Sequence, residues 1–318
     1  MVVDAFNLCK ILSRDPVTQG FLFKFFQKYL NKLYSPISSY DTLRITFDQY
    51  DKLLTLPDLM NPYIFGIATL VIFIIVIGRY FIIAMLFQLF FYRWQKEKWA
   101  KRWLGKKQPD REQFLREVKW SLVTSLIFAV AGTCTAILWQ NGYTQLYTSA
   151  HKYGLLYLPV SLLISMFIHE TYYYWLHRWM HKPSVFRVLH KTHHDSNTTS
   201  VWTAFSFHPL EGLLQAIILP AIIMFLPMHL SVLLLQLTLM TLSSVINHLE
   251  IESYPANFHK HIIGKWIIGA THHSLHHKQF RYNYGLYFTF WDKIVKTESP
   301  RFSSLFEEKT NTKKDEIN

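Results

Sequence analysis

Four long apolar blocks constrain the fold of this chain more than any other feature. They cover residues 63–92, 120–139, 153–175 and 213–247, and the last block is interrupted near Pro227. A helix needs about 20 apolar residues to cross a bilayer, so each block is long enough to cross or nearly cross one. The last block fits two shorter helices that form a hairpin. We therefore predict an all-α, integral membrane helical bundle with four or five membrane segments.

The basic residues predict how these segments are oriented. The chain carries a formal net charge of +12, and residues 93–119 hold ten Lys or Arg, whereas residues 140–153 hold only Lys152. Because short cytoplasmic loops are rich in Lys and Arg, the first loop should be cytoplasmic and the second should lie outside. Counting onward, residues 176–212 and the chain after Asn247 return to the cytoplasm. We do not expect nucleic-acid binding, because the basic residues flank apolar spans and form no separate domain.

The histidines are concentrated in the segments predicted to be cytoplasmic. Of 16 histidines, 15 lie between His169 and His277, and the densest groups form three boxes: HRWMH (177–181), HKTHH (190–194) and HHSLHH (272–277). Spacings of three and four residues place side chains on one face of a helix. The boxes therefore predict rows of imidazoles, gathered in a cytoplasmic histidine-rich metal-binding cap.

The first box follows directly from an apolar stretch. No Pro lies between Trp175 and Pro183, so a single helix of nearly 30 residues should begin near Tyr153. Such a helix is roughly 45 Å long, against a hydrocarbon core of about 30 Å. His177 and His181 should therefore stand where the helix leaves the bilayer.

The number of histidines indicates two metal ions. Neutral imidazole binds Fe, Zn, Cu and Ni, so the pattern alone does not select the metal. Zinc hydrolases use fewer protein ligands, and the chain has no HExxH sequence. A dinuclear iron centre that activates oxygen fits better, and beside a membrane it could reach a lipid C–H bond. Ligating histidines usually hydrogen-bond to carboxylates, and the nearby candidates are Glu170, Asp195, Glu211 and Glu252.

The ordered motifs resemble those of a known group of enzymes. HRWMH, HKTHH, INHLE (246–250) and HHSLHH resemble the fatty acid hydroxylase and sterol desaturase superfamily of membrane di-iron oxidoreductases. Within it, FSFHPLEG (205–212) and YNYGLYFTFWDKI (282–294) resemble the sterol C5-desaturase branch. The resemblance covers residues 167–296, and the upstream spans match only in general layout. The same boxes serve desaturation, hydroxylation and methyl oxidation, so the motifs specify the superfamily better than the substrate.

The resemblance implies a set of catalytic metal ligands. These are the nine histidines His177, His181, His190, His193, His194, His248, His273, His276 and His277. Fatty acid hydroxylases place a further histidine four residues after the one that matches His248, and this chain has Glu252 there. Either Glu252 is a ligand, or His272 or His261 supplies the contact, or one metal keeps an open position. His208 precedes Pro209, and we expect it to have a structural role or to support a ligand without binding metal itself.

The resemblance also implies the cofactors and partners. A reduced pair of Fe ions would activate O2 and abstract hydrogen from a lipid; loss of a second hydrogen gives an alkene, and capture of a hydroxyl gives an alcohol. Electrons should come from cytochrome b5 or a ferredoxin with its reductase, because the chain has no Gly-rich nucleotide motif and no haem domain. A sterol or fatty acyl substrate should enter from the bilayer, past residues 172–174 and Trp202. The membrane would be the endoplasmic reticulum in a eukaryote and the cytoplasmic membrane in a bacterium.

Other functions remain open on the sequence alone. A fatty acid or sphingolipid hydroxylase, or a sterol methyl oxidase, would use the same boxes. Two alternatives belong to other functional classes: a metal-binding transporter and a catalytically silent lipid-binding scaffold. Transport usually requires ionisable residues along the spans, and the apolar blocks between residues 63 and 139 contain hardly any.

We predict four regions along the chain. Residues 1–61 should form an amphipathic region on the membrane surface, and residues 62–152 the first spans with the basic cytoplasmic loop. Residues 153–300 should form the catalytic domain. Residues 301–318 are polar and charged, so we expect a disordered tail.

Overall fold

The computed structural model describes residues 57–105 and 107–311. The amphipathic region predicted for residues 1–61 lies almost entirely outside the described residues. Within them the chain is helical, and its only strands are β1 (Leu146–Tyr147) and β2 (Met228–His229). The predicted all-α fold of a helical membrane protein is confirmed.

Three of the described helical segments are long and apolar enough to cross a membrane. They are Pro62–Trp94, Arg111–Gln140 and Leu230–Asn247. Length and composition thus support three of the four or five predicted segments. The helix in the predicted span at 153–175 is not apolar enough to be counted with them, because it carries His169 and Glu170. The first half of the predicted hairpin is divided into shorter helices.

The first two long helices, α4 (Pro62–Leu89) and α6 (Arg111–Gln140), pack against each other. The helix α4 continues into a π-helical turn (Phe90–Trp94), followed by α5 (Lys96–Trp99) and a 3₁₀ turn (Ala100–Arg102). Small side chains allow close approach: a Cβ atom added at Gly132 would lie 3.2 Å from Ile72 Cγ2. The hydroxyls of Thr69 and Thr133 form a buried hydrogen bond of 2.9 Å. Small residues and interhelical hydrogen bonds are the usual means of packing helices in a bilayer.

The helix that carries the first histidine box is shorter than predicted. It is α7 (Tyr157–Met180), with 24 residues and a length of about 36 Å. It begins at Tyr157 rather than Tyr153 because Gly154, at φ +81°, turns the chain just before it. It ends before Pro183, as predicted.

The apolar block at 213–247 does form a hairpin. Its helices are α10 (Pro209–Ala216), α11 (Ile218–Phe225) and α12 (Leu230–Asn247). The turn between α11 and α12 contains β2, which pairs in parallel with β1 through Leu146↔Met228 and Tyr147↔His229. This pairing fixes the turn against the loop that follows α6.

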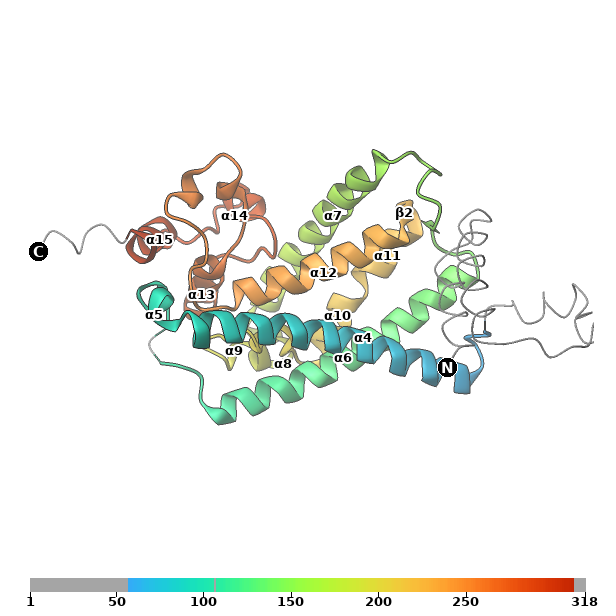
Figure 1. Ribbon diagram of the computed structural model, residues 1–318, viewed down its shortest axis with the longest axis horizontal. Helices are drawn as coiled ribbons and strands as arrows, with labels where there is room; N and C mark the ends of the chain where they lie inside the picture. Colours follow the sequence, from blue (N-terminus) through green and yellow to red (C-terminus); the bar gives the residue numbers. More distant parts are fainter. Residues whose placement is uncertain (1–56, 106, 312–318) are drawn as a thin grey trace, which may run out of the picture.

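The remaining short elements form a cap at one end of the bundle. They are α8 (Pro183–Leu189), α9 (Lys191–His194), α13 (Ala270–Gln279), α14 (Phe290–Ile294), α15 (Phe302–Thr310) and 3₁₀ turns at Thr203–Phe205, Phe258–Lys260 and Gly264–Trp266. Figure 1 shows α13, α14 and α15 at the end of the bundle near α5, whereas β2 lies toward the opposite end.

The C-terminal region is ordered further than we predicted. Residues 302–310 form α15, and its Phe302 and Phe306 are buried. Phe302 stacks on His272 with 3.5 Å between ring centroids, and Phe306 lies 4.6 Å from the ring of His259. These two apolar contacts, hidden in a polar sequence, explain why the expectation of disorder from residue 301 was wrong. Residues 312–318 lie outside the described residues.

Candidate metal centre

The structure gathers the nine predicted histidines into two adjacent clusters. Cluster 1 consists of His177, His181, His190, His194 and His276, and cluster 2 consists of His193, His248, His273 and His277. Within each cluster the candidate ligand atoms all lie within 4.8 Å of one another. The rings of His194 and His277 stack across the two clusters, with centroids 4.4 Å apart.

The spacing within the boxes explains how the clusters are divided. Pairs four residues apart share one helical face, so each pair enters one cluster. His177 and His181 of α7 both belong to cluster 1, and His273 and His277 of α13 both belong to cluster 2. His276 lies about 100° around α13 from His277, so it faces the other cluster. The helix α13 therefore supplies both clusters.

The nitrogen atoms converge at the distances expected of neighbouring metal ligands. In cluster 1, His177 Nε2 lies 3.0 Å from His190 Nε2, and His276 Nε2 lies 3.1 Å from those of His181 and His194. In cluster 2 the corresponding separations are 2.9 to 3.2 Å. Two nitrogens bound at right angles to an ion, at about 2.1 Å each, lie about 3.0 Å apart. Five nitrogens in cluster 1 also exceed the four positions of a tetrahedral zinc site.

Five of the histidines are oriented by their other ring nitrogen. The Nδ1 partners are the backbone carbonyls of Tyr284 for His177 (2.8 Å), Tyr282 for His276 (2.7 Å), Ser206 for His193 (3.2 Å) and Ser244 for His248 (2.7 Å), and the Glu211 carboxylate for His190 (2.9 Å). These acceptors hold the proton on Nδ1. The lone pair of Nε2 therefore points into the cluster, as metal binding requires.

Burial keeps the imidazoles neutral. It lowers the pKa of His181, His194 and His276, and neighbouring histidines lower each pKa further. The charged form would leave water and approach other imidazolium groups, so both causes act in the same direction. Neutral imidazole is the form that binds a metal ion, so the site is prepared for one at neutral pH.

Two residues considered as ligands lie outside both clusters. Glu252 accepts hydrogen bonds from Thr271 N (3.1 Å), Thr271 Oγ1 (2.6 Å) and Tyr254 N (2.9 Å). It thus caps the start of α13, and burial raises its pKa. His272 points away from the clusters: it stacks on Phe302 and lies 3.5 Å from Glu298. We therefore correct the ligand set by removing Glu252 and His272.

His261 and His208 also lie outside both clusters. His261 Nδ1 accepts a hydrogen bond from Ile263 N (3.3 Å), and His261 is exposed. His208 Nδ1 accepts from Leu210 N (3.3 Å) and caps α10. Of the alternatives at the Glu252 position, the open metal position agrees with the geometry, since cluster 2 offers four nitrogens and cluster 1 offers five.

Only one of the four predicted carboxylate partners contacts a box histidine. That residue is Glu211, which is fully buried and bonds to His190. Glu170 accepts instead from the backbone N–H groups of Leu286 (3.0 Å) and Tyr287 (2.7 Å). Asp195 forms an exposed ion pair with Lys191.

Several structural carboxylates were missed in the sequence, among them Glu117 and Glu250. Glu117 of α6 is buried and accepts hydrogen bonds from side chains of the loop after α9, namely Ser196, Ser200 and Thr203, each at 2.7 Å. Glu250, the last residue of INHLE, accepts from Thr199, Ser274 and Lys278. The place of Glu250 in a quoted motif was the one available signal, whereas nothing in the spacing of Glu117 distinguished it from a surface residue.

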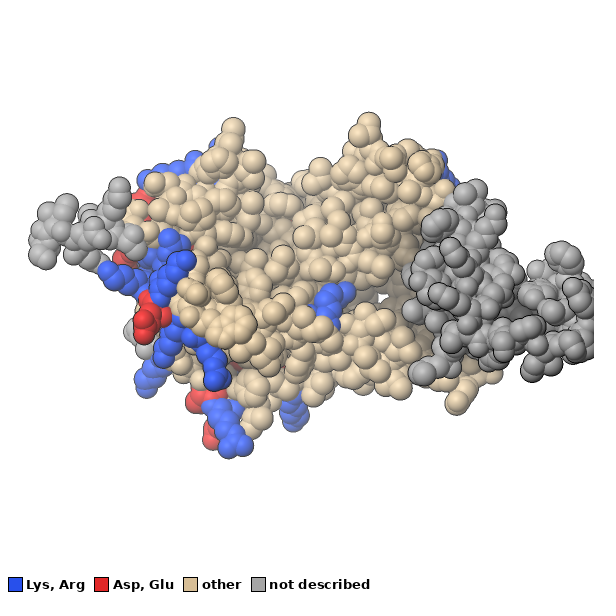
Figure 2. All heavy atoms as spheres, in the orientation of Figure 1, with Lys and Arg blue, Asp and Glu red and all other residues tan. Residues whose placement is uncertain are grey.

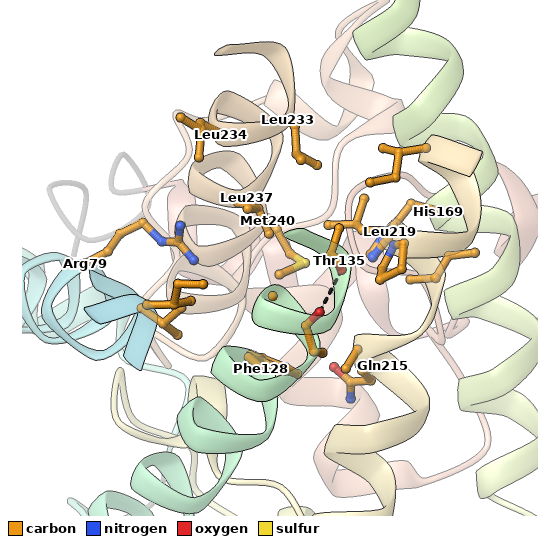
Figure 3. A pocket seen from close by; sticks show the side chains of 18 of the residues that line it. Arg79, Phe128, Thr135, His169, Gln215, Leu219, Leu233, Leu234, Leu237 and Met240 are labelled. Atoms are coloured by element: carbon orange, nitrogen blue, oxygen red, sulfur yellow. Dashed lines mark hydrogen bonds between the residues drawn. The ribbon is translucent and has the colours of Figure 1, made fainter. Parts of the chain in front are cut away.

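An apolar cavity of about 380 Å³ lies beside the clusters. It is enclosed by α4, α6, α7, α11 and α12, and Figure 3 shows leucines of α12 and Leu219 around it. Two residues connect its wall to the histidines: Tyr173 lies 5.3 Å from the His177 ring, and Phe207 lies 5.0 Å from the His193 ring. Of the predicted substrate-contacting residues, Tyr172 and Tyr173 line the cavity. Tyr174 and Trp202 do not.

The chain is similar to one known family and to several known proteins. Residues 162–297 match the family described as "Fatty acid hydroxylase". Similar proteins include human "Lathosterol oxidase", 30% identical over 187 residues (58% of this chain and 60% of the relative). A "Delta(7)-sterol 5(6)-desaturase" of Eremothecium gossypii is 31% identical over 207 residues (64% and 56%), and a "Delta(7)-sterol-C5(6)-desaturase" of Nicotiana tabacum is 30% identical over 190 residues (58% and 65%).

These matches cover part of each protein. The similarity spans 60% of the human relative and 56% of the Eremothecium gossypii relative. No solved structure matches the chain. The matched region contains both histidine clusters. Residues 162–297 are therefore similar to the fatty acid hydroxylase family, and the relatives confirm the resemblance to the sterol desaturase-like branch.

Proposed function

We propose that this protein is an O2-dependent membrane oxidoreductase that desaturates a sterol, with two iron ions held by the nine clustered histidines. The observation that carries this proposal is the convergence of five and four imidazoles, all buried except the half-buried His181, beside an apolar cavity. Iron bound there would supply the oxidising chemistry that breaks a lipid C–H bond. Nitrogen ligands are suitable for iron, and two ions account for a number of ligands that one ion cannot use.

The chain itself would contribute orientation and exclusion of water. The backbone carbonyls and Glu211 hold the imidazoles with Nε2 directed inward, so little rearrangement is needed when metal binds. Tyr173 and Phe207 bring the cavity wall into contact with both clusters. A bound hydrocarbon would therefore lie against the metal centre and away from bulk water.

We favour a sterol over other lipids because of the relatives. The human relative is named for oxidation of lathosterol, and two others are named for desaturation at the 5(6) position of Δ7-sterols. Desaturation would remove two hydrogens from neighbouring carbons of the bound lipid. A hydroxylase or methyl oxidase would use the same cavity and clusters, and product analysis separates these reactions.

We infer that an external electron carrier docks at the capped end of the bundle. Figure 2 shows Lys and Arg side chains, with fewer Asp and Glu among them, gathered at the end where α5 and α15 lie, while the rest of that face is nearly free of charge. A basic surface attracts acidic partners such as a cytochrome b5 or a ferredoxin. The basic segment 93–119 would face the cytoplasm under the positive-inside rule, and the histidine clusters would then lie on the cytoplasmic side.

The test is a product analysis with a matched control. Full-length wild type, His193→Ala and His151→Ala would be expressed with a reductase and electron carrier in cells that receive lathosterol. We expect wild type and His151→Ala to form a sterol two mass units lighter, because His151 is exposed and outside the clusters. His193→Ala should form none.

Each other result has a defined meaning. A product 16 mass units heavier would replace desaturation with hydroxylation. Purified wild type that binds two irons but leaves lathosterol unchanged would contradict the sterol assignment. Clusters that take up no iron would contradict the proposed oxidoreductase.

A further inference from the structure

One buried imidazole on the cavity wall takes no part in the clusters. His169 of α7 is 3% exposed and lines the cavity, and Figure 3 shows its ring directed into that space. Its Nδ1 is buried and has no hydrogen-bond partner within the part of the chain that the structure describes. A buried polar atom without a partner is costly, so a partner from outside the chain would be favourable.

Two other histidines outside the clusters hydrogen-bond to the chain through Nε2, although Nδ1 of His259 is also buried without a partner among the described residues. His229 Nε2 hydrogen-bonds to Thr148 O (2.8 Å), and His259 Nε2 lies 3.3 Å from Glu307 Oε1. Both are held by the chain in structural contacts. A structural role would give His169 similar contacts, which the described residues do not provide.

The position of His169 relates the cavity to the clusters. His169, Tyr173 and His177 follow one another at four-residue intervals on one face of α7. Their ring centroids are 6.5 Å apart for the first pair and 5.3 Å apart for the second. A ligand atom bound at His169 would therefore lie two helical turns from cluster 1, with Tyr173 between them.

A second unpaired polar group lies beside His169. Tyr287 does not itself line the cavity, but its ring is 5.5 Å from the His169 ring, and its hydroxyl is buried with no partner among the described residues. A neutral imidazole can accept a hydrogen bond, and a tyrosine hydroxyl can donate one. A lipid hydroxyl both donates and accepts, so it matches this pair. A carboxylate can only accept hydrogen bonds, so it does not match this pair. Its natural partner would be Arg79, the one charged side chain among residues 62–92, which points into the cavity from the opposite wall.

We propose that His169 and Tyr287 form a subsite that binds the hydroxyl group of the lipid substrate. This inference rests on the proposed function, since it names how the same cavity would hold a sterol. In lathosterol the hydroxyl is on C3, in the same ring as C5. Fixing the hydroxyl at this subsite would limit the positions that C5 can take relative to the clusters. His169 and Tyr287 are thus positioning residues.

The experiment compares two ligands and four proteins. Equilibrium binding of radiolabelled lathosterol and of its 3-deoxy analogue would be measured on purified full-length wild type, His169→Phe, Tyr287→Phe and Thr135→Val. Thr135 is the matched control, because it lines the same cavity but its hydroxyl already donates to Ala131 O (2.7 Å). Wild type should bind lathosterol about tenfold more tightly than the analogue, the usual value of one hydrogen bond to a buried group.

The variants separate this inference from a change of cavity shape. His169→Phe and Tyr287→Phe should each lose most of the preference for lathosterol while still binding the 3-deoxy analogue as wild type does. Thr135→Val should keep the preference. Equal weakening of both ligands, or an unchanged preference in His169→Phe, would overturn the subsite. Wild type that oxidises lathosterol and binds both ligands equally would overturn the subsite alone, whereas wild type that binds neither would contradict the sterol assignment and the subsite with it.

Discussion

Glu211 contacts a histidine of cluster 1 and none of cluster 2, so a change at Glu211 should weaken iron binding at cluster 1 alone. Glu211 is the one carboxylate that contacts a cluster histidine in the described structure, at 2.9 Å from His190 Nδ1, and it is fully buried. Glu211→Ala would leave the His190 N–H without an acceptor and free the ring to turn. Losing a buried hydrogen bond of this kind costs about 1–3 kcal/mol. This corresponds to a weakening of iron binding at cluster 1 by roughly 10- to 100-fold, as measured for similar outer contacts.

The assay is an iron titration of the purified metal-free protein against a chelator of known affinity. Wild type should fill both clusters, whereas Glu211→Ala should keep the affinity of cluster 2 and lose that of cluster 1. Glu211→Gln retains an acceptor oxygen and should lose less. Asp195→Ala is the control, because Asp195 forms only an exposed ion pair. Equal loss at both clusters, or no loss, would refute the claim that Glu211 acts through His190.

Three further results are expected. Glu252→Ala should leave the number of bound irons unchanged but lower the free energy of unfolding by about 1–2 kcal/mol, because it removes the cap of α13; a drop in iron content would return Glu252 to the ligand set. Phe306→Ala should lower the free energy of unfolding by about 3–5 kcal/mol in a thermal or denaturant melt, since Phe306 is buried against the cap; a change below about 1 kcal/mol would mean that α15 is not anchored by this contact. The metal-free protein should lose stability as pH falls below about 6.5. Burial lowers the pKa of His181 and His276 in the folded chain, so the unfolded chain binds more protons than the folded one at these pH values. Thermal melts at pH 7.5, 6.5 and 5.5 check this, and an unchanged free energy of unfolding would contradict it.

The sequence predicted the clusters well because helical spacing is a local property. His177 and His181, or His273 and His277, share a helical face whatever surrounds them. The same reasoning did not locate the partners of these rings. Carbonyls such as Tyr284 O and Ser206 O are invisible in a sequence, because any residue supplies one. Which backbone group meets a ring depends on the path of the loops.

The carboxylates show the same limit. Four were candidates because they are near the boxes in sequence, and only Glu211 contacts a histidine. Glu117 is far from every box along the chain, yet it gathers the loop that follows α9. The ends of helices were also difficult to predict. Gly154 delays the start of α7, and two phenylalanines order α15 within a polar stretch.

The residue at position 252 connects these observations. The resemblance raised the expectation of a histidine four residues after His248, and the chain has a glutamate. A carboxylate at the start of a helix accepts free backbone N–H groups and is favoured by the helix dipole. Glu252 does this for α13, the helix that carries His273, His276 and His277. In place of a possible ligand, position 252 thus holds a group that fixes the helix carrying three candidate ligands. It leaves cluster 2 with four nitrogens, one fewer than cluster 1, and Phe207 brings this cluster into contact with the cavity wall. The cluster with fewer candidate ligands would thus be one that a bound lipid can approach.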